Sequence, residues 1–174
     1  MGVNITKLTQ WQFNKLYGLV PVSGSSNVAV LEKPVVGFLE GSTTSDTEVV
    51  VVSPLFRIPT LRKLIKSLCV TFYVTAKVDS GSGEITKIEA DFELGGTTVQ
   101  TKTVSWTRTV TETSYTTYSL INVEFNNIAT NGTDTEAIRI KVYGHGDGTN
   151  TLSVKVMANQ DYPLVFSALC KILE

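Results

Sequence analysis

The sequence predicts one all-β domain folded as an antiparallel β-sandwich, and three observations support this prediction. Seven or more short segments alternate apolar and polar residues or are dense in β-branched residues, as strands are. Turn residues separate these segments at a spacing of roughly 8–14 residues, which is typical of sandwiches and barrels. A chain of 174 residues with 42% hydrophobic content is also long enough to bury one sizeable core.

The first 45 residues differ from the rest of the chain. Their first apolar residues follow a roughly helical spacing: Ile5, Leu8, Trp11 and Leu16. Pro21 would end a helix there, and Pro34 limits the strand-like stretch around it to an edge or a bend. We therefore predict an N-terminal arm over residues 1–45 and a β-sandwich domain over residues 46–174.

Beyond residue 46 the elements can be assigned in order. We expect strands over residues 47–53, 67–79, 84–95, 97–110, 114–128, 137–144 and 151–159. Residues Pro59 to Lys66 could form a short helix with proline in its first turn. The apolar tail, residues 161–174, is expected to be a closing strand in preference to a short helix that begins at Pro163.

Two of these strands carry informative side-chain patterns. From Leu68 to Val78 every second residue is apolar, so these side chains would share one buried face. In the next strand, Ile85 and Ile88 can lie on the same face only if a bulge or a twist separates them. Both patterns indicate strands with one face on a core.

Glycines mark the turns between strands. Gly95-Gly96 is the signal of a two-residue hairpin, and we expect residues 144–150, GHGDGTN, to close a second hairpin. This loop contains His145, the one histidine that any Ser-His-Asp or Cys-His scheme would need. Because glycines flank it, we expect an exposed turn residue and no catalytic residue.

The stretch from Cys69 to Asn159 resembles single jelly-roll β-sandwiches. It contains, in this order, CVTFYVTAKVDSG, EITKIEADFELGGTTVQTKTVSW, YTTYSLINVEFNNI and EAIRIKVYGHGDGTNTLSVKVMA. Carbohydrate-binding and galactose-binding-like modules follow this pattern, and so do coat, spike and decoration proteins of viruses. The resemblance covers roughly half of the chain and includes no diagnostic motif. It implies an antiparallel jelly-roll-like sandwich, and it supports the fold more than the function.

Charge and composition exclude several kinds of partner. The net charge is −1 and the isoelectric point is about 5.9, whereas a nucleic-acid binder would carry a basic stripe. No run approaches the ~18 apolar residues that a membrane span needs. Charged residues make up 18% of the chain, which suits a surface that neighbouring molecules partly cover.

Metal ligands are few. One histidine and two distant cysteines, Cys69 and Cys170, do not make a zinc site. Both cysteines lie in apolar stretches, and the sequence leaves open whether they are buried thiols or a disulfide. The loops Asp79–Glu84 and Asp147–Asn150 offer oxygen ligands and leave open a structural calcium ion, although turn formation explains them equally well. We otherwise expect no cofactor.

With no convergent set of titratable groups, the sequence predicts a protein that is not an enzyme. The first hypothesis is a structural subunit of a virus particle (capsid, decoration or spike) or of a comparable ordered extracellular assembly. Its partners would be copies of itself and other subunits of the particle, because an arm can add a strand to a neighbouring sheet. The residues assigned to these assembly contacts are Trp11, Phe13, Tyr17 and Phe166.

The alternative hypothesis is a carbohydrate-binding or attachment module. Such a module would stack a glycan on exposed aromatic side chains, for which Trp106, Tyr115 and Tyr143 are the candidates. Aromatic residues in sandwiches also pair across strands or fill the core. The two hypotheses predict different behaviour in solution: an assembly subunit should form large particles or filaments, whereas a lectin should stay small and bind glycans, and the loss of Trp106 or Tyr143 should abolish that binding.

Overall fold

The computed structural model describes most of the chain. It covers residues 8–12, 19–21, 28–31, 38–58, 63–128, 130, 134–157, 161–162 and 164–172. Side chains are described within residues 38–58, 67–128, 130, 134–157, 161–162 and 164–165. The described residues contain strands and no helix, so the prediction of an all-β sandwich is confirmed.

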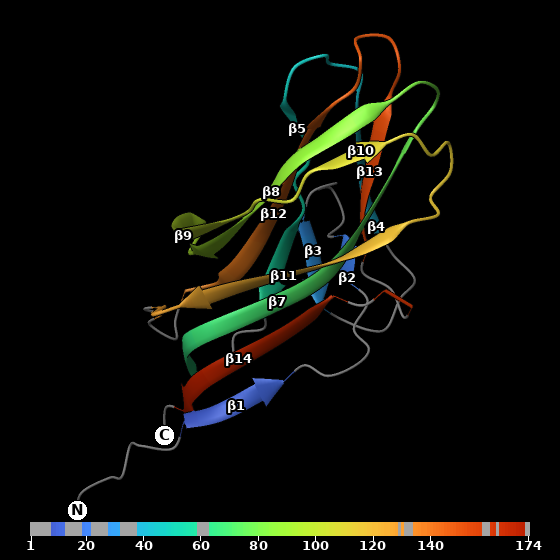
Figure 1. Cartoon of the computed structure of the whole chain (residues 1–174). Coiled ribbons are helices and arrows are strands. Elements are labelled where there is room, and N and C mark those ends of the chain that lie inside the picture. The colour runs from blue at the N-terminus through green and yellow to red at the C-terminus, as the bar shows by residue number, and fades with distance from the viewer. Residues whose placement is uncertain are drawn as a thin grey trace, which may run out of the picture.

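Two sheets face each other across the core (Figure 1). Among the described residues, sheet A has six strands: β1 (Leu8–Gln12), β4 (Phe38–Thr43), β7 (Lys63–Val78), β11 (Tyr118–Asn126), β13 (Leu152–Met157) and β14 (Val165–Ile172). Sheet B has eight: β2 (Leu19–Pro21), β3 (Val28–Leu31), β5 (Val49–Val52), β6 (Leu55–Ile58), β8 (Gly83–Leu94), β9 (Thr97–Val104), β10 (Arg108–Val110) and β12 (Glu136–His145).

One long strand organises each sheet. In sheet A, β7 pairs with β11 on one side and with β13 and β14, one after the other, on its other side. In sheet B, β8 pairs with β12 on one side and with β9 and β10 on the other. The described pairings are antiparallel except that of β3 with β6, which is parallel. Within the described residues, sheet A is therefore antiparallel throughout, and sheet B is antiparallel apart from the pair of β3 and β6.

The core lies between the two sheets and follows the predicted alternation. On β7 every second residue from Leu68 to Val78 is completely buried, as expected. On β12, Ile138, Ile140 and Val142 are completely buried as well. The same alternation on β11 buries one set of side chains and exposes the other. Period-2 patterning therefore identified the core face of each of these strands.

The irregularity in β8 is a β-bulge. Tyr143 of β12 lies opposite Lys87, and the next residue, Gly144, lies opposite Ile85, so Thr86 has no opposite residue. This extra residue brings Ile85 to the same face as Ile88, and both are fully buried. The predicted bulge is confirmed.

The hairpin predicted at Gly95-Gly96 joins β8 to β9. Both glycines have positive φ, 58° and 83°, as a type I′ turn requires of its two central residues. A side chain at either position would strain the backbone, so local chemistry fixes this turn.

The helical expectations were wrong. The short helix expected from Pro59 to Lys66 is replaced at Lys63 by the start of β7, which pairs with β14 from that residue onward; residues 59–62 lie outside the described part. Near the N-terminus the helical spacing around Leu8 and Trp11 is overruled in the same way, because residues 8–12 form β1. In both places pairing with β14, on one of its two edges, satisfies the backbone groups of the segment, and this tertiary pairing outweighs local spacing. The closing strand predicted for the tail is confirmed as β14.

The loop at residues 144–150 does not close a hairpin. It connects β12 in sheet B to β13 in sheet A, so it crosses from one layer to the other. It packs on the β4–β5 loop at the end of the sandwich that is uppermost in Figure 1. There the N–H groups of Gly146 and Gly148 donate to the carbonyls of Ser45 and Thr44, at 2.7 and 2.9 Å. A Cβ on Gly146 would lie 2.4 Å from the Asn150 carbonyl oxygen, so only glycine fits this close approach.

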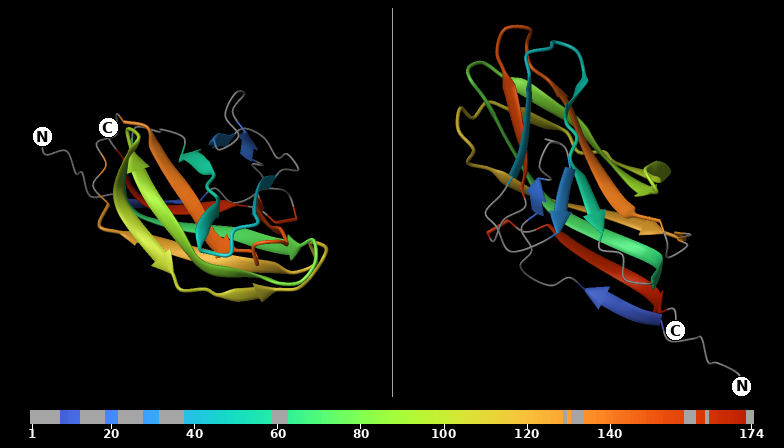
Figure 2. Two further views of the ribbon diagram at one scale, coloured as in Figure 1. Left: turned by 90° about the horizontal axis from the view of Figure 1, so that it is seen from above. Right: turned by 180° about the vertical axis from the view of Figure 1, so that it is seen from behind.

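The first 45 residues contribute strands to both sheets. β4 pairs with β13 and β1 with β14 in sheet A, and β3 joins β6 in sheet B. Figure 2 shows β1 and β14 side by side at one end of sheet A. The division into an arm and a sandwich at residue 45 stays a prediction.

No helix among the described residues is long and apolar enough to cross a membrane.

Candidate functional site

The outer face of sheet A carries an aromatic–lysine cluster, formed by Phe38, Glu40, Lys77, Tyr115 and Lys155. The Lys155 ammonium lies between two rings, 3.8 Å from the centroid of Phe38 and 4.0 Å from that of Tyr115. The Tyr115 hydroxyl donates to the Glu40 carboxylate, which lies 3.7 Å from the Lys155 ammonium. Burial, together with the bond to Glu40, holds the pKa of the Tyr115 phenol well above its usual range. This cluster therefore offers aromatic surface, a cation and a carboxylate at one place.

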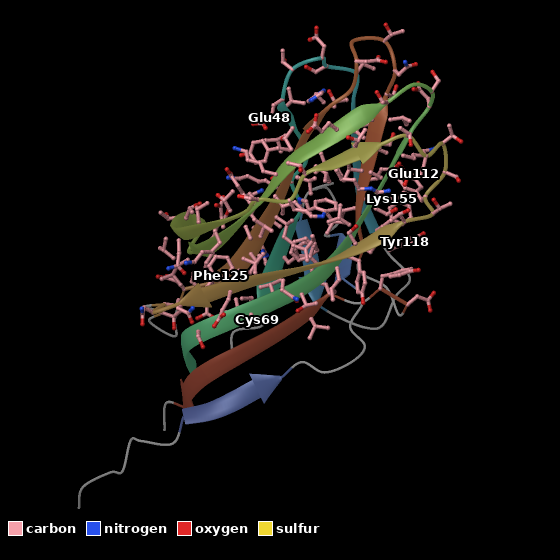
Figure 3. The ribbon with its side chains drawn as sticks, viewed as in Figure 1. Glu48, Cys69, Glu112, Tyr118, Phe125 and Lys155 are labelled. Atoms are coloured by element: carbon pink, nitrogen blue, oxygen red, sulfur yellow. The ribbon has the colours of Figure 1, made fainter. Side chains whose placement is uncertain are left out.

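A loop from sheet B places Tyr115 in the cluster. Residues 111–117 connect β10 to β11 and are held at their start by Glu112, whose carbonyl accepts the Val78 N–H at 2.8 Å. The Glu112 carboxylate pairs with Arg108 at 2.5 Å. Backbone N–H groups and the Arg108 guanidinium lower the pKa of this carboxyl, so it stays ionised. Figure 3 shows Glu112, Lys155 and Tyr118 on the same side of the molecule.

A second group of rings adjoins the cluster. Tyr162 stacks on Tyr118 with centroids 4.0 Å apart and meets Tyr73 edge-on at 5.2 Å. Thr75 of β7 lies opposite Tyr118 and Lys155 in the strand register, and it is completely buried although the outer face would normally expose it. The aromatic side chains therefore cover this part of sheet A. The ring of Phe38 is 45% exposed.

The outer face of sheet B is different in kind, because charged side chains pair there, one pair within β8 and two between β12 and β8. Three ion pairs follow one another: Lys87–Glu89 at 3.1 Å, Lys141–Asp91 at 2.5 Å and Arg139–Glu93 at 2.7 Å. At the end of this row the Tyr143 hydroxyl donates to Glu89 at 2.8 Å. Burial and this bond raise the pKa of Tyr143 to about 12. The face is neutralised internally, which leaves little charge for a ligand.

The three candidate glycan contacts lie at three separate places. Tyr115 lies on the outer face of sheet A and Tyr143 on that of sheet B. Trp106, between β9 and β10, is partly buried against the core. Sequence spacing could not have shown this, because the loop that carries Tyr115 crosses between the sheets. A glycan role for each of them stays a prediction.

Two of the four residues assigned to assembly contacts lie in described strands. Trp11 of β1 is opposite Ala168, and Phe166 of β14 is opposite Val70. Phe13 and Tyr17 lie outside the described residues, and the side chains of all four are not described. Their role in assembly stays a prediction.

Cys69 carries a free thiol, and the side chain of Cys170 lies outside the described part.

The two loops proposed to offer calcium ligands do lie together. The Asp79 carboxylate accepts the N–H groups of Ser80 and Thr151, and the Asp147 carboxylate accepts those of Thr149 and Asn150. Bonds from backbone N–H groups lower the pKa of both carboxyls. Within the described ranges, no group of three or more carboxylate, histidine or cysteine side chains could hold a metal ion. These carboxylates close turns, and a calcium ion there stays a prediction.

His145 is the last residue of β12 and is half-buried, whereas we expected an exposed loop tip. Its Nδ1 lies 2.8 Å from the Gly146 carbonyl oxygen, and its Nε2 lies 3.5 Å from the Glu84 carboxylate. The ring therefore ties the end of β12 to the start of β8. The expectation that the chain is not an enzyme stays a prediction.

Sequence reasoning missed one unusual residue, Glu136. It opens β12 on the core-facing side, is 3% exposed, and has one carboxylate oxygen without a hydrogen-bond partner within the described residues. Burial raises the pKa of its carboxyl to about 7. The sequence did contain a signal, because Glu136 continues the alternation of Ile138, Ile140 and Val142 and so falls on their buried face.

Comparisons with known proteins assign no family. No family model matches the chain, and no curated protein matches it. Among solved structures, a chain of infectious bursal disease virus, Gx strain, is 13% identical with a TM-score of 0.41, over 98% of this chain and 41% of that one. A chain of the Gt strain is 15% identical with a TM-score of 0.35, over 97% and 38%. This chain thus spans about two fifths of those chains.

Proposed function

We propose that this chain is a structural subunit that associates with copies of itself, in a virus particle or a comparable ordered assembly, and that its sandwich is a jelly roll. The strand order supports the jelly roll. Sheet A runs β11-β7-β13-β4, and facing it β9 and β10 lie beside β8, then β12, then β5 and β6. From β4 to β13 the chain passes back and forth between these sheets in the manner of two interleaved Greek keys, the arrangement of jelly rolls.

The observation that carries the assembly role is the way β1 joins sheet A. All five of its residues pair with β14, from Leu8 opposite Lys171 to Gln12 opposite Ser167. Among the described strands, β14 is the only one that β1 pairs with. Addition of a strand through main-chain hydrogen bonds is how the arm of one subunit extends the sheet of another. Exchange of β1 between identical copies would use the same bonds.

The test is the size of the full-length chain and of a chain that begins at residue 13. We expect the full-length protein to form oligomers or particles in light scattering and negative-stain microscopy. The shortened protein should keep its β-sheet circular dichroism and form smaller species, because it lacks β1. A full-length chain that remains monomeric up to its solubility limit contradicts the proposal. Equal sizes for the two chains contradict the role of β1 alone.

The second candidate function is carbohydrate binding, and one observation favours it. The aromatic–lysine cluster sets the exposed ring of Phe38 beside Lys155, Glu40 and Tyr115, so an apolar platform has charged hydrogen-bonding groups at its rim. A sugar ring presents apolar and hydroxyl surfaces together, and such a mixed site can accept both.

A glycan array with three versions of the chain tests this candidate. If the cluster binds a glycan, Tyr115→Ala should weaken the signal at least ~10-fold, the equivalent of about 1.4 kcal/mol. Tyr143→Ala is the matched control, because this tyrosine lies on the opposite outer face, and it should bind as the unmodified chain does. An array with no signal for the unmodified chain argues against the candidate.

A further inference from the structure

The sandwich has two long edge strands on the same side, β9 in sheet B and β11 in sheet A, and they differ in how they are protected. β9 contains a bulge, because Thr98 lies opposite Glu93 and Gln100 opposite Phe92, which leaves Val99 without an opposite residue. Its Lys102 lies opposite the buried Ala90, on the inward side of the sheet. Bulges and inward-pointing lysines are devices that keep an edge strand from pairing with another chain.

β11 has none of these devices. Its nine residues pair with β7 in unbroken register, from Tyr118 opposite Thr75 to Asn126 opposite Ser67. The strand, YSLINVEFN, contains no proline, lysine or arginine, and Glu124 is its one charged residue. Leu120 on its outer face is 51% exposed. A long, regular, weakly charged edge strand is a template for a further strand.

The backbone groups on the open edge of β11 can be assigned. The Asn126 carbonyl accepts a hydrogen bond from the side chain of Gln100, a residue of β9 in sheet B. This carbonyl therefore points away from β7. Successive residues of an antiparallel strand point their N–H and C=O groups to opposite edges. Leu120, Asn122 and Glu124 therefore present theirs to the open edge, and β7 is the only described strand that pairs with β11.

We infer that β11 pairs antiparallel with β11 of a second copy of this chain, about a two-fold axis at Asn122, so that sheet A continues from one copy into the next. This inference rests on the proposed self-association and names the surface that serves it. The register follows from the sequence of the strand. Centring the pair on Asn122 lets all nine residues overlap and matches edge-facing residues with edge-facing residues, as antiparallel hydrogen-bonded pairs require.

Charge also favours this register. It places Glu124 of each copy opposite Leu120 of the other, whereas centring the pair on Glu124 would set two carboxylates face to face. Asn122 would meet its own copy on the outer face, where its side-chain oxygen already accepts a bond from Thr71 at 2.6 Å and its amide N–H groups remain as donors. The strand is thus self-complementary without a like-charge pair.

Four substitutions test the pairing through the dissociation constant of the self-associated form, measured by sedimentation velocity. Leu120→Glu sets two carboxylates opposite each other at both symmetric positions and should weaken association about 10-fold or more. Leu120→Lys sets a cation opposite Glu124 and should associate as the unmodified chain does. The double variant Leu120→Glu/Glu124→Lys should restore association. Val99→Glu on β9, at 52% exposure, is the matched control and should have no effect.

A cysteine at the axis tests the register directly. In a Cys69→Ala/Cys170→Ala background, Asn122→Cys should form a disulfide-linked dimer under mild oxidation, because the hydrogen-bonded pair on the axis has its Cα atoms about 5.5 Å apart, within disulfide reach. Val99→Cys in the same background should not. Thermal melting of each variant separates lost pairing from lost folding.

The outcomes separate the two proposals. An unmodified chain that stays monomeric overturns the self-association and the pairing with it. An unmodified chain that associates, but equally so with Leu120→Glu, overturns the pairing and leaves the self-association standing. Cross-linking of Val99→Cys in place of Asn122→Cys would assign the contact to β9 and also overturn the pairing through β11.

Discussion

Replacing Glu136 by glutamine should remove a pH dependence of stability that the unmodified protein shows between about pH 4.5 and 7. Glu136 lies on the buried face of β12, and burial raises the pKa of its carboxyl to about 7 from an ordinary value of 4.5. The folded state thus holds this proton more tightly than the unfolded state. The group costs nothing below the unfolded pKa, and the cost of ionising it in place grows as the pH rises to the folded pKa.

The size of the effect follows from the shift. Each pKa unit corresponds to about 1.4 kcal/mol, so the full penalty above pH 7 is about 3 kcal/mol. Urea unfolding at pH 4 and pH 8 measures it. We expect the free energy of unfolding of Glu136→Gln, relative to the unmodified chain, to be about 3 kcal/mol more favourable at pH 8 than at pH 4.

The control for this prediction is Glu124→Gln. Glu124 is an exposed glutamate on β11, so its replacement should leave the pH dependence of the unmodified chain intact. Equal pH dependence for Glu136→Gln and the unmodified chain would show that Glu136 is not held in a buried environment.

Replacing Phe92 by alanine should cost about 3–5 kcal/mol of the free energy of unfolding, as is usual for a fully buried phenylalanine. Phe92 of β8 and Phe125 of β11 are both completely buried, and their ring centroids lie 6.1 Å apart at an angle of 52°. This contact joins sheet B to sheet A. Thermal or urea unfolding of Phe92→Ala gives the loss, and Val99→Ala, at an exposed position of the adjacent strand β9, should change stability by no more than about 0.5 kcal/mol.

A double-mutant cycle extends this prediction. If the two rings meet as described, the losses of Phe92→Ala and Phe125→Ala should not add, and the coupling should be about 0.5–1.5 kcal/mol. Strictly additive losses would mean that the two sheets do not meet at this pair.

Much of the sandwich could be predicted from the sequence because the alternation of apolar and polar residues within each strand identifies its buried face. The alternation from Leu68 to Val78, the offset between Ile85 and Ile88, and the paired glycines at 95 and 96 each depend on residues only a few positions apart. The predictions that failed were of another kind. The helix expected up to Lys66 and the hairpin expected around His145 are local interpretations that partners far along the chain overruled.

The candidate sites show the same limit. Tyr115 was singled out as an aromatic residue, but its neighbours Glu40 and Lys155 lie at distant positions in the sequence. Which aromatic side chains lie close together depends on the sheet on which each strand or loop places its residues. Trp106 and Tyr143 could not be placed relative to Tyr115 for this reason.

The sequence by itself determined that this protein is all-β and which side of each central strand is buried. The tertiary structure alone decided the order of the strands, the crossing of residues 144–150 between the sheets, and the contrast between a protected edge at β9 and an open edge at β11. The physical reason is that side-chain alternation is a local property of the backbone, whereas the partner of an edge is chosen by long-range hydrogen bonding and packing.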